Sequence, residues 1–370
     1  MRNTTYGRSV AVADGSASLC LRSRTRLPIG PLTSVRTRPK FGRTETRLGV
    51  QSGGQVPRAS RCKTVGWQVL AGLFLVGAIG LAASGTAEAA PLPVGNFASG
   101  VATELTSPGG NPPGSDIWNC RPSATHPYPV ILVHGTLANE NFSWQALSPM
   151  LANAGYCVFA FNYGADSSTF GHFYGLADIV QSAKQLSTFT DKVLAATGAG
   201  QVDMVGHSQG GMMPRYYVQF LGGAAKVHML VGLAPSNEGT TVDGLGTLAT
   251  LFGDIGVPVL SLSGCVSCTQ QLVGSAFLQK LNAGGGISPS VRYAVIESRY
   301  DEVVTPYTNA FLPAAPNVQN TLLQNQCSTD FTEHLGIIYD PIALQDVMNA
   351  LGPDFPAFHP SCSIVLPVVG

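Results

Sequence analysis

Charged residues are scarce in this sequence: Lys, Arg, Asp and Glu account for 11% of its 370 residues, against roughly 25% in an average globular domain. Hydrophobic residues make up 45%, which excludes an intrinsically disordered chain, because disorder requires low hydrophobicity. Basic residues are especially few beyond residue 63, where eight Lys and Arg accompany 19 Asp and Glu. Such an acidic region disfavours a nucleic acid partner, because phosphate binding requires clustered positive charge.

Internal repeats and long Gly- or Pro-rich linkers are absent as well, so we expect one domain over residues 90–370. Six cysteines fall in this region, an even number that predicts three disulfides in an exported protein. From proximity and then from the order of elements, the expected pairs are Cys265 with Cys268, Cys120 with Cys157, and Cys327 with Cys362. Fifteen connectivities are possible for six cysteines.

The segment Cys265-Val-Ser-Cys268 also has the spacing of a redox motif or of half a zinc site. No second such motif and no pair of His residues completes a metal site in the sequence. We therefore expect no metal and no cofactor.

The first 63 residues form a basic leader, with 13 Lys and Arg, two acidic residues and no hydrophobic periodicity. An apolar run from Val65 to Ala83 follows, with Gln68 as its polar exception, and then Ala87-Glu88-Ala89. Together, the basic residues, the apolar run and the small residues predict a signal peptide over residues 64–89 that is cleaved after Ala89. We therefore expect a secreted or cell-envelope protein. The alternative is a membrane anchor, since 19 apolar residues can just span a bilayer.

Short apolar runs alternate with helical patterns along the rest of the chain. The runs that predict buried strands are 130–133, 157–161, 202–205, 227–233 and 291–296, with a further candidate at 321–323. Helical patterns cover 144–153, 176–194 and 212–220, and Gly198 is placed to cap the second of them. This alternation predicts an α/β fold with a doubly wound, mostly parallel central sheet and helices on both faces.

The pentapeptide Gly206-His207-Ser208-Gln209-Gly210 matches G-x-S-x-G. A chain this rich in Gly and Ser can contain the pattern by chance, and a plain glycine turn is the alternative. Its context argues for function, because a predicted strand precedes it and a predicted helix follows it. A nucleophile on such a turn is strained, and glycine is needed at 206 and 210 because side chains there would collide with the neighbouring strand or helix. We take Ser208 as the nucleophile.

A serine nucleophile needs a histidine base and an acid, which follow it in the order Ser, acid, His in this type of fold. His126, His134 and His172 precede the serine, His207 lies within the turn itself, and His228 falls inside a predicted strand. His359 belongs to a Pro-rich tail. His334, in a polar loop, is therefore the favoured base.

The acid is expected just beyond a strand, where parallel sheets place functional groups. Asp301 follows the run at 291–296 and fits this position, with Glu302 as the near rival and Asp254 and Asp330 as distant ones. Two backbone N–H groups should stabilise the oxyanion of the reaction, and we expect those of Gln209 and Thr136. This leaves His134 with a structural role.

These residues resemble the secreted bacterial lipases and esterases of the α/β-hydrolase fold, particularly the actinobacterial class 2 lipases. The resemblance rests on VILVHGT at 130–136, GHSQGG at 206–211, LAPSNEGTT at 233–241, YDEVVTP at 300–306 and EHL at 333–335. It implies the α/β-hydrolase fold and hydrolysis of carboxylic esters, often acylglycerols, with Ser208, Asp301 and His334 as the triad. The leader before Lys63 has no counterpart in that family.

Ester hydrolysis through an acyl-enzyme is thus the leading hypothesis for function. Envelope acyl transfer by the same triad and a catalytically silent binding protein are the alternatives. Apolar residues in two segments, 161–176 and 239–286, could line an acyl-chain cleft over the serine, or could belong to the core: Phe170, Phe173, Tyr174, Leu245, Leu248, Leu251, Phe252, Leu272, Phe277 and Leu281. We accordingly expect faster turnover of medium-chain than of acetyl esters, an ester or lipid substrate, and transient contact with a lipid interface.

Overall fold

The computed structural model describes residues 90–165, 172–254, 264–352 and 358–368, all of which belong to the unit 83–370. The basic leader and signal peptide expected in residues 1–89 lie outside this part of the chain. Within the described ranges, no helix combines the length and hydropathy required to cross a bilayer.

A single parallel sheet organises the described residues, with the strand order β2-β1-β3-β4-β5-β6. Its strands are β1 (Val130–Val133), β2 (Val158–Ala160), β3 (Val202–His207), β4 (Val227–Leu233), β5 (Arg292–Glu297) and β6 (Val318–Leu322). The predicted parallel α/β sheet is therefore confirmed, and every predicted strand is present within a few residues of its expected position.

Helices cover both faces of the sheet, which explains why its strands are apolar on both sides. In β1, Val130 and Leu132 enter one core, whereas Ile131 and Val133 enter the other. On the second face lie α4 (Ile179–Thr197), α5 (Gln209–Phe220) and α8 (Ala276–Asn282). The first core is covered by α2 (Glu140–Ser143), α3 (Leu147–Asn153), α6 (Val242–Asp254) and α10 (Pro341–Ala350).

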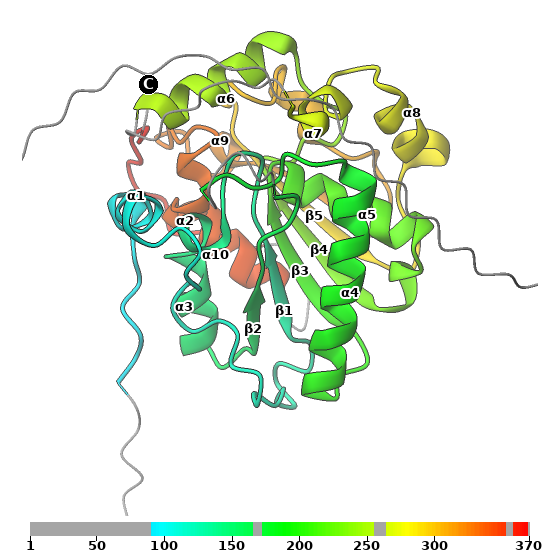
Figure 1. The fold of residues 1–370 in the computed structure, drawn as a ribbon. Coiled ribbons are helices and arrows are strands. Elements are labelled where there is room, and N and C mark those ends of the chain that lie inside the picture. The colour runs from blue at the N-terminus through cyan, green and yellow to red at the C-terminus, as the bar shows by residue number, and fades with distance from the viewer. Residues whose placement is uncertain (1–89, 166–171, 255–263, 353–357, 369–370) are drawn as a thin grey trace, which may run out of the picture. The chain divides into compact units, whose positions relative to one another are not determined.

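Three further helices complete the described fold: α1 (Phe97–Thr106), α7 (Val266–Gln270) and α9 (Leu323–Gln326). In Figure 1, α4 and α5 lie on the opposite side of the sheet from α3 and α10. The segment that carries α6, α7 and α8 connects β4 to β5 and lies at one end of the sheet (Figure 1). That end is the carboxyl end of the strands, because the segment begins where β4 finishes.

Helix boundaries differ from the sequence-based ones where side chains cap the backbone. The helix expected at 144–153 begins later, at Leu147 of α3, because the short helix α2 precedes it and has Trp144 as its C-cap. Helix α2 begins after Asn139, which accepts a hydrogen bond from the N–H of Phe142. Helix α4 begins at Ile179 rather than 176, since Asp178 is its N-cap. It ends at Thr197, and the φ of 75° at its C-cap, Gly198, confirms the predicted glycine cap.

All three predicted disulfides are confirmed. Cys120 is bonded to Cys157, Cys265 to Cys268, and Cys327 to Cys362. The second pair rules out a free dithiol at the C-x-x-C sequence in this state of the chain. Each of the three bonds joins segments that are close in sequence, so none connects the two ends of the described region.

Candidate active site

The candidate residues meet at the point where the sheet changes winding direction. From β1 the chain runs outward to β2 and then returns to β3 on the other side of β1. The loops that follow β1 and β3 therefore leave the same end of the sheet in opposite directions, which is where parallel α/β sheets bind ligands. Thr136 lies in the first of these loops and Ser208 directly follows β3.

Ser208 occupies the turn between β3 and α5, with φ 54° and ψ −123°. A positive φ is strained for a residue with a side chain, and such strain is typical of functional turns. Its N–H donates a hydrogen bond to the carbonyl of Leu233 at 2.9 Å. The turn is thus fastened to the adjacent strand β4, and α5 begins immediately after the serine rather than at 212 as expected.

Glycines make this turn possible. A Cβ on Gly206 would overlap the carbonyl of Gly210, and one on Gly210 would overlap the carbonyls of Val133 and His134. Both obstacles are backbone atoms, which cannot rotate away. These contacts agree with the expectation that side chains at 206 and 210 would collide with the neighbouring strand or helix.

Asp301 and His334 form a hydrogen-bonded pair, with 2.7 Å between Oδ2 and Nδ1 and both side chains fully buried. The other oxygen of Asp301, Oδ1, accepts hydrogen bonds from the N–H groups of Val303 and Val304 at 2.8 and 2.7 Å. The carboxylate therefore faces three donors. On the far side of the ring, His334 Nε2 is buried and has no hydrogen-bond partner among the described residues, Ser208 included.

The charge on Asp301 governs the ionisation of His334. Burial alone would lower the pKa of the imidazole, but the Asp301 carboxylate, helped by Glu302 and Glu333, raises it above its ordinary value. Glu302 is itself perturbed: burial first, and then the negative charges of Asp301 and Glu333, outweigh the effect of His334 and raise its pKa to about 7. The pair thus lies in an acidic and desolvated environment.

The rival acids occupy other positions. Glu302 Oε2 lies 3.5 Å from the backbone N–H of His334 and does not bond the ring. Asp330 is buried but accepts its hydrogen bond from the N–H of Thr332, and Asp254 is the last residue of α6. Asp301 is therefore the acid that the structure joins to the His334 ring.

The other histidines have separate contacts. His134 is fully buried and stacks on Tyr163 at 4.4 Å between ring centroids, and burial lowers its pKa to about 4. The contacts of the remaining four lie elsewhere: His126 against Tyr156, His172 on Glu104, His228 on Asp203, and His359 exposed. The structural role expected for His134 agrees with its stacking.

His207 contributes a contact that sequence reasoning did not anticipate. Its Nε2 lies 2.9 Å from the carbonyl oxygen of His334, and since a carbonyl only accepts, this nitrogen carries the proton. Burial, reinforced by the neighbouring charge of His334, keeps the pKa of His207 well below its ordinary value. A neutral imidazole beside the nucleophile turn therefore fixes the backbone of His334.

The loop after β1 is held close to the serine by two glutamines. Thr136 Oγ1 accepts hydrogen bonds from Gln209 Nε2 at 2.7 Å and from Gln271 Nε2 at 2.9 Å. Across the described residues, the backbone N–H groups of Thr136 and Gln209 donate to no acceptor. These are the two groups that the sequence analysis expected to face an oxyanion, and Gln271 is a supporting residue that it missed.

A cavity of about 480 Å³ lies beside the loops that carry Asp301 and His334, although neither of these residues nor Ser208 lines it. It is lined by Thr247, Leu251, Tyr300, Glu302, Phe331, Glu333 and Pro367. Tyr300 and Glu302 flank Asp301 in the chain, and Glu333 precedes His334. The cavity therefore lies against the loops that carry the pair, and its lining is largely apolar.

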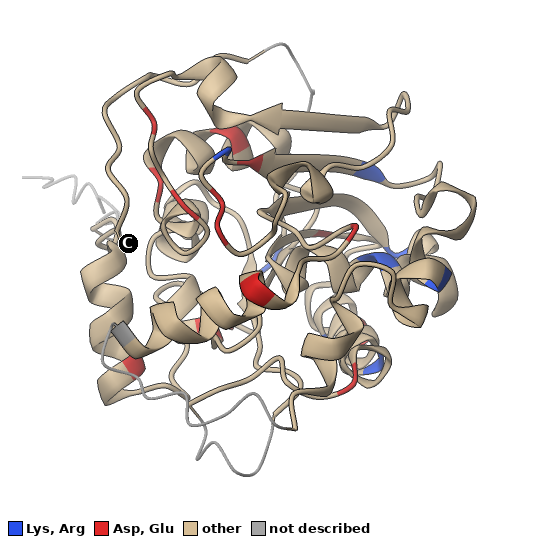
Figure 2. Ribbon diagram, turned by 90° about the horizontal axis from the view of Figure 1, so that it is seen from above, with Lys and Arg blue, Asp and Glu red and all other residues tan. Residues whose placement is uncertain are grey.

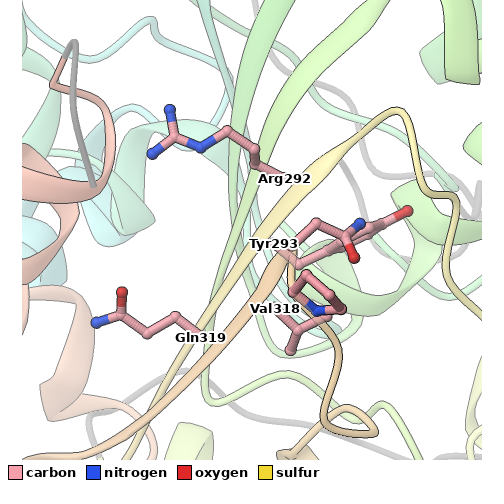
Figure 3. A pocket seen from close by; sticks show the side chains of 6 residues that line it. Arg292, Tyr293, Val318 and Gln319 are labelled. Carbon is pink, nitrogen blue, oxygen red and sulfur yellow. The ribbon is translucent and has the colours of Figure 1, made fainter. Parts of the chain in front are cut away.

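A second cavity, of about 470 Å³, lies at the other end of the sheet (Figure 3). It is lined by the first residues of β5 and β6, among them Arg292, Tyr293 and Val318. Arg292 and Gln319 extend to one side of the strands and Tyr293 to the other (Figure 3). Because the strands are parallel, this cavity is remote from Asp301, which follows the opposite end of β5.

The apolar segments expected over the serine are largely part of the core. Phe173, Leu245, Leu248 and Phe252 are buried in the first core, while Phe277 and Leu281 belong instead to the second, on the α4 and α5 face. Leu251 lines the cavity beside Asp301, and Phe170 lies outside the described residues. The expected preference for medium-chain esters stays a prediction.

Metal-binding geometry is not found among the described residues, where no group of three or more His, Cys, Asp or Glu side chains could hold an ion.

Comparison with known proteins places these residues in context. The sequence model of the lipase (class 2) family matches residues 127–345. Triacylglycerol lipases from Pseudarthrobacter phenanthrenivorans and Burkholderia plantarii are each 36% identical to this chain over 94 residues, or 24% of its length. The match spans 27% of the first relative and 24% of the second, so it covers about a quarter of each.

Among solved structures, Aspergillus fumigatus lipase B aligns with a TM-score of 0.50 at 22% sequence identity, over 66% of this chain and 56% of the fungal chain. At this identity the likeness concerns the fold, and it agrees with the α/β-hydrolase expectation.

The contact with Asp301 predicts how the pKa of His334 differs from its ordinary value. We expect an NMR titration to give this ring a pKa above its ordinary value, and Asp301→Asn to lower it below that value, because the burial persists without the carboxylate. Glu302→Gln, which removes a more distant charge, should lower the pKa less. The His134 ring, titrating at about 4, provides an internal reference. A wild-type pKa of His334 at or below the ordinary value would contradict the pairing.

Proposed function

The chain belongs to the class 2 lipase family, and we propose that it is a serine carboxylic ester hydrolase in which Ser208 is the nucleophile, His334 the general base and Asp301 the acid that orients it. The buried 2.7 Å contact between Asp301 and His334 carries this proposal. The strained position of Ser208 at the turn after β3 supports it, as does the expected chain order of the three residues.

Asp301 prepares His334 for proton transfer. By accepting a hydrogen bond from Nδ1, it places the ring proton there and leaves the lone pair of Nε2 available. Nε2 takes the hydroxyl proton of Ser208 as Oγ attacks the ester carbonyl, and the resulting imidazolium is stabilised by the carboxylate. The hydrogen bond between Ser208 Oγ and His334 Nε2 is not formed in this structure. It has to form when substrate binds, as is common for catalytic hydrogen bonds in enzymes without ligand.

The attack produces a tetrahedral oxyanion, which the N–H groups of Gln209 and Thr136 stabilise. His334 then returns its proton to the leaving alkoxide, so that the alcohol departs and Ser208 carries the acyl group. Water repeats the sequence, with His334 again as base, and releases the carboxylic acid. Because the base must be neutral, activity is lost as the pH falls through the pKa of His334.

The substrate class we propose is a lipid ester such as an acylglycerol, since the matching relatives from two bacteria are triacylglycerol lipases. Export is proposed as well. Three disulfides support it, because such bonds persist mainly in oxidising compartments. N-terminal sequencing of the exported protein checks this, with Ala90 expected as the first residue.

An exposed apolar surface supports contact with a lipid interface. This surface, called the tail patch, consists of Tyr300, Phe331, Ile364, Leu366 and Val368. Their segments are joined: the rings of Tyr300 and Phe331 lie 5.5 Å apart, and the N–H of Phe331 donates to the carbonyl of Val365. Contiguous exposed apolar patches are uncommon on soluble monomers and mark interaction sites.

The tail patch adjoins the proposed triad, because Tyr300 precedes Asp301 and Phe331 lies in the loop that leads to His334. In the end-on view of Figure 2, Asp and Glu are spread over this end of the molecule, whereas most Lys and Arg lie on the side away from the C-terminus. An anionic lipid surface would be repelled here. A neutral lipid aggregate is therefore the interface we propose.

The nucleophile is tested by Ser208→Ala. We expect this variant to lose ester hydrolysis by roughly 10⁴-fold or more and to escape labelling by a fluorophosphonate probe, while remaining folded. His334→Ala and Asp301→Asn should each cripple turnover, with Glu302→Gln as the matched control that does not. Retention of a tenth of the activity by Ser208→Ala would refute the assignment.

The same assay separates hydrolysis from acyl transfer. With glycerol or a sugar present, a hydrolase releases mainly free fatty acid, whereas an acyltransferase forms a new ester through the same Ser208. Predominant new ester would favour the transferase. Absence of probe labelling in the wild type would favour a silent binding protein.

The tail patch is tested by Ile364→Ser with Leu366→Ser, which are 72% and 68% exposed. We expect this double variant to lose several-fold in rate on emulsified triacylglycerol while keeping its rate on a soluble acetyl ester, because adsorption is weakened and the triad is untouched. Ile117→Ser is the control, since Ile117 is 54% exposed near the start of β2, at the other end of the sheet. An equal loss on both substrates would contradict docking through this patch.

A further inference from the structure

A second carboxyl group lies beside Asp301. Glu297, the last residue of β5, has a fully buried side chain whose Oε1 accepts a hydrogen bond from the N–H of Ser298 at 2.8 Å. Its carboxyl group lies close enough to that of Asp301 for the two to interact, and its buried Oε2 has no hydrogen-bond partner among the described residues. Two ionised carboxylates cannot hydrogen-bond to each other, because each can only accept; a proton on one of the two groups would give the buried Oε2 a partner.

Hydrogen-bond donors decide which of the two is protonated. Asp301 faces three, the N–H groups of Val303 and Val304 and Nδ1 of His334, whereas Glu297 faces only the N–H of Ser298. Donors stabilise the ionised form of a carboxyl group. The negative charge therefore resides on Asp301 and the proton on Glu297.

Electrostatics supports the same assignment. Burial, followed by the negative charges of Asp301 and Glu302, raises the pKa of Glu297 well above its ordinary value. Two adjacent buried carboxyl groups cannot both ionise without a large cost, as in other carboxyl pairs that share one proton. The remaining charged or titratable groups around His334 are Glu333 and the neutral His207, and neither supplies a compensating positive charge.

We propose that Glu297 is a positioning residue that keeps its proton throughout turnover and donates a hydrogen bond from its carboxylic acid to the Asp301 carboxylate. It touches neither substrate nor reacting atoms and acts through Asp301. This inference rests on the proposed function, because it assigns Asp301 to the triad. No proton leaves Glu297 in any step.

Two consequences follow for the pair. The hydrogen bond gives Asp301 a fourth donor, which fixes the orientation in which it holds the His334 ring. Because Glu297 keeps its proton, it adds no second negative charge near His334. Such a charge would raise the pKa of His334 further. Glu297 thereby sets the lower end of the pH range in which the base is neutral.

The protonation state can be measured without catalysis. We expect the infrared difference spectrum between wild type and Glu297→Gln at neutral pH to contain the C=O band of a protonated carboxylic acid that shifts in D₂O. Bands of an ionised carboxylate in its place would overturn the proposal. This readout does not depend on Ser208, so it remains valid even if the proposed function fails.

The role in turnover is read from the acid limb of the pH profile of kcat/KM. Glutamine reproduces the donor and the neutral charge of protonated Glu297. In Glu297→Gln, the pH at which kcat/KM falls to half of its maximum on the acid side should therefore stay unchanged. Glu297→Leu removes the donor, so we expect kcat to fall about tenfold at unchanged KM, in line with the loss of one buried hydrogen bond. Its acid limb should move to higher pH, because the less solvated Asp301 carboxylate holds the proton of His334 more strongly.

An ionised Glu297 would give the opposite result for glutamine. Glu297→Gln would then remove a negative charge, lower the pKa of His334 and move the acid limb to lower pH. If Glu297→Leu does not fold, the glutamine variant and the infrared band still decide the question. Glu140→Gln is the matched control: burial, aided by Asp116, raises the pKa of Glu140 to about 8, and it does not act on His334. This control should show an acid band but leave the limb unchanged.

Discussion

The close approach of bare backbone between β1, β3 and the start of α5 is the constraint on which the site depends. Val133 and His134 of the first segment pass so near to Gly210 that no side chain fits between them. This approach brings the loop after β1 to the serine, where Gln209 can hold Thr136. It also forces Ser208 into its strained conformation, so that the position of the proposed nucleophile is a consequence of sheet packing rather than of local preference.

The three carboxyl groups near His334 differ in how well their negative charges are stabilised. Asp301 is solvated by backbone and ring donors, Glu302 is partly desolvated with a pKa near 7, and Glu297 is wholly buried beside another carboxyl group. His334 is the single group in contact with these carboxyl groups that gains a positive charge during the proposed reaction. Its acidic surroundings favour that charge at the moment when the tetrahedral intermediate forms.

Sequence reasoning succeeded where the determining contacts are local. The bounds of β4 match the apolar run at 227–233, and Gly198 ends α4 because its left-handed conformation depends on that residue alone. It also placed Asp301 and His334 correctly relative to the sheet, since both follow strands. It could not find the contacts of His207 and Gln271, because each depends on a partner supplied by a distant segment. The hydrogen bond from His207 to His334, for example, spans 127 residues.

The parallel order of the sheet has a consequence for how the site is assembled. Neighbouring parallel strands can pair only after a crossover has closed, and loop closure makes such long-range contacts late and slow during folding. The conformation of Ser208 depends on the pairing of β3 with β4. The loop that carries His334 follows β6, so it is placed at this end of the sheet only after β5 and β6 have paired. Partly folded chains would therefore have helices and some strands, but Ser208 and the Asp301–His334 pair would not yet lie at the same end of a completed sheet. Recovery of the proposed activity would report the last stage of folding, after the secondary structure has already formed.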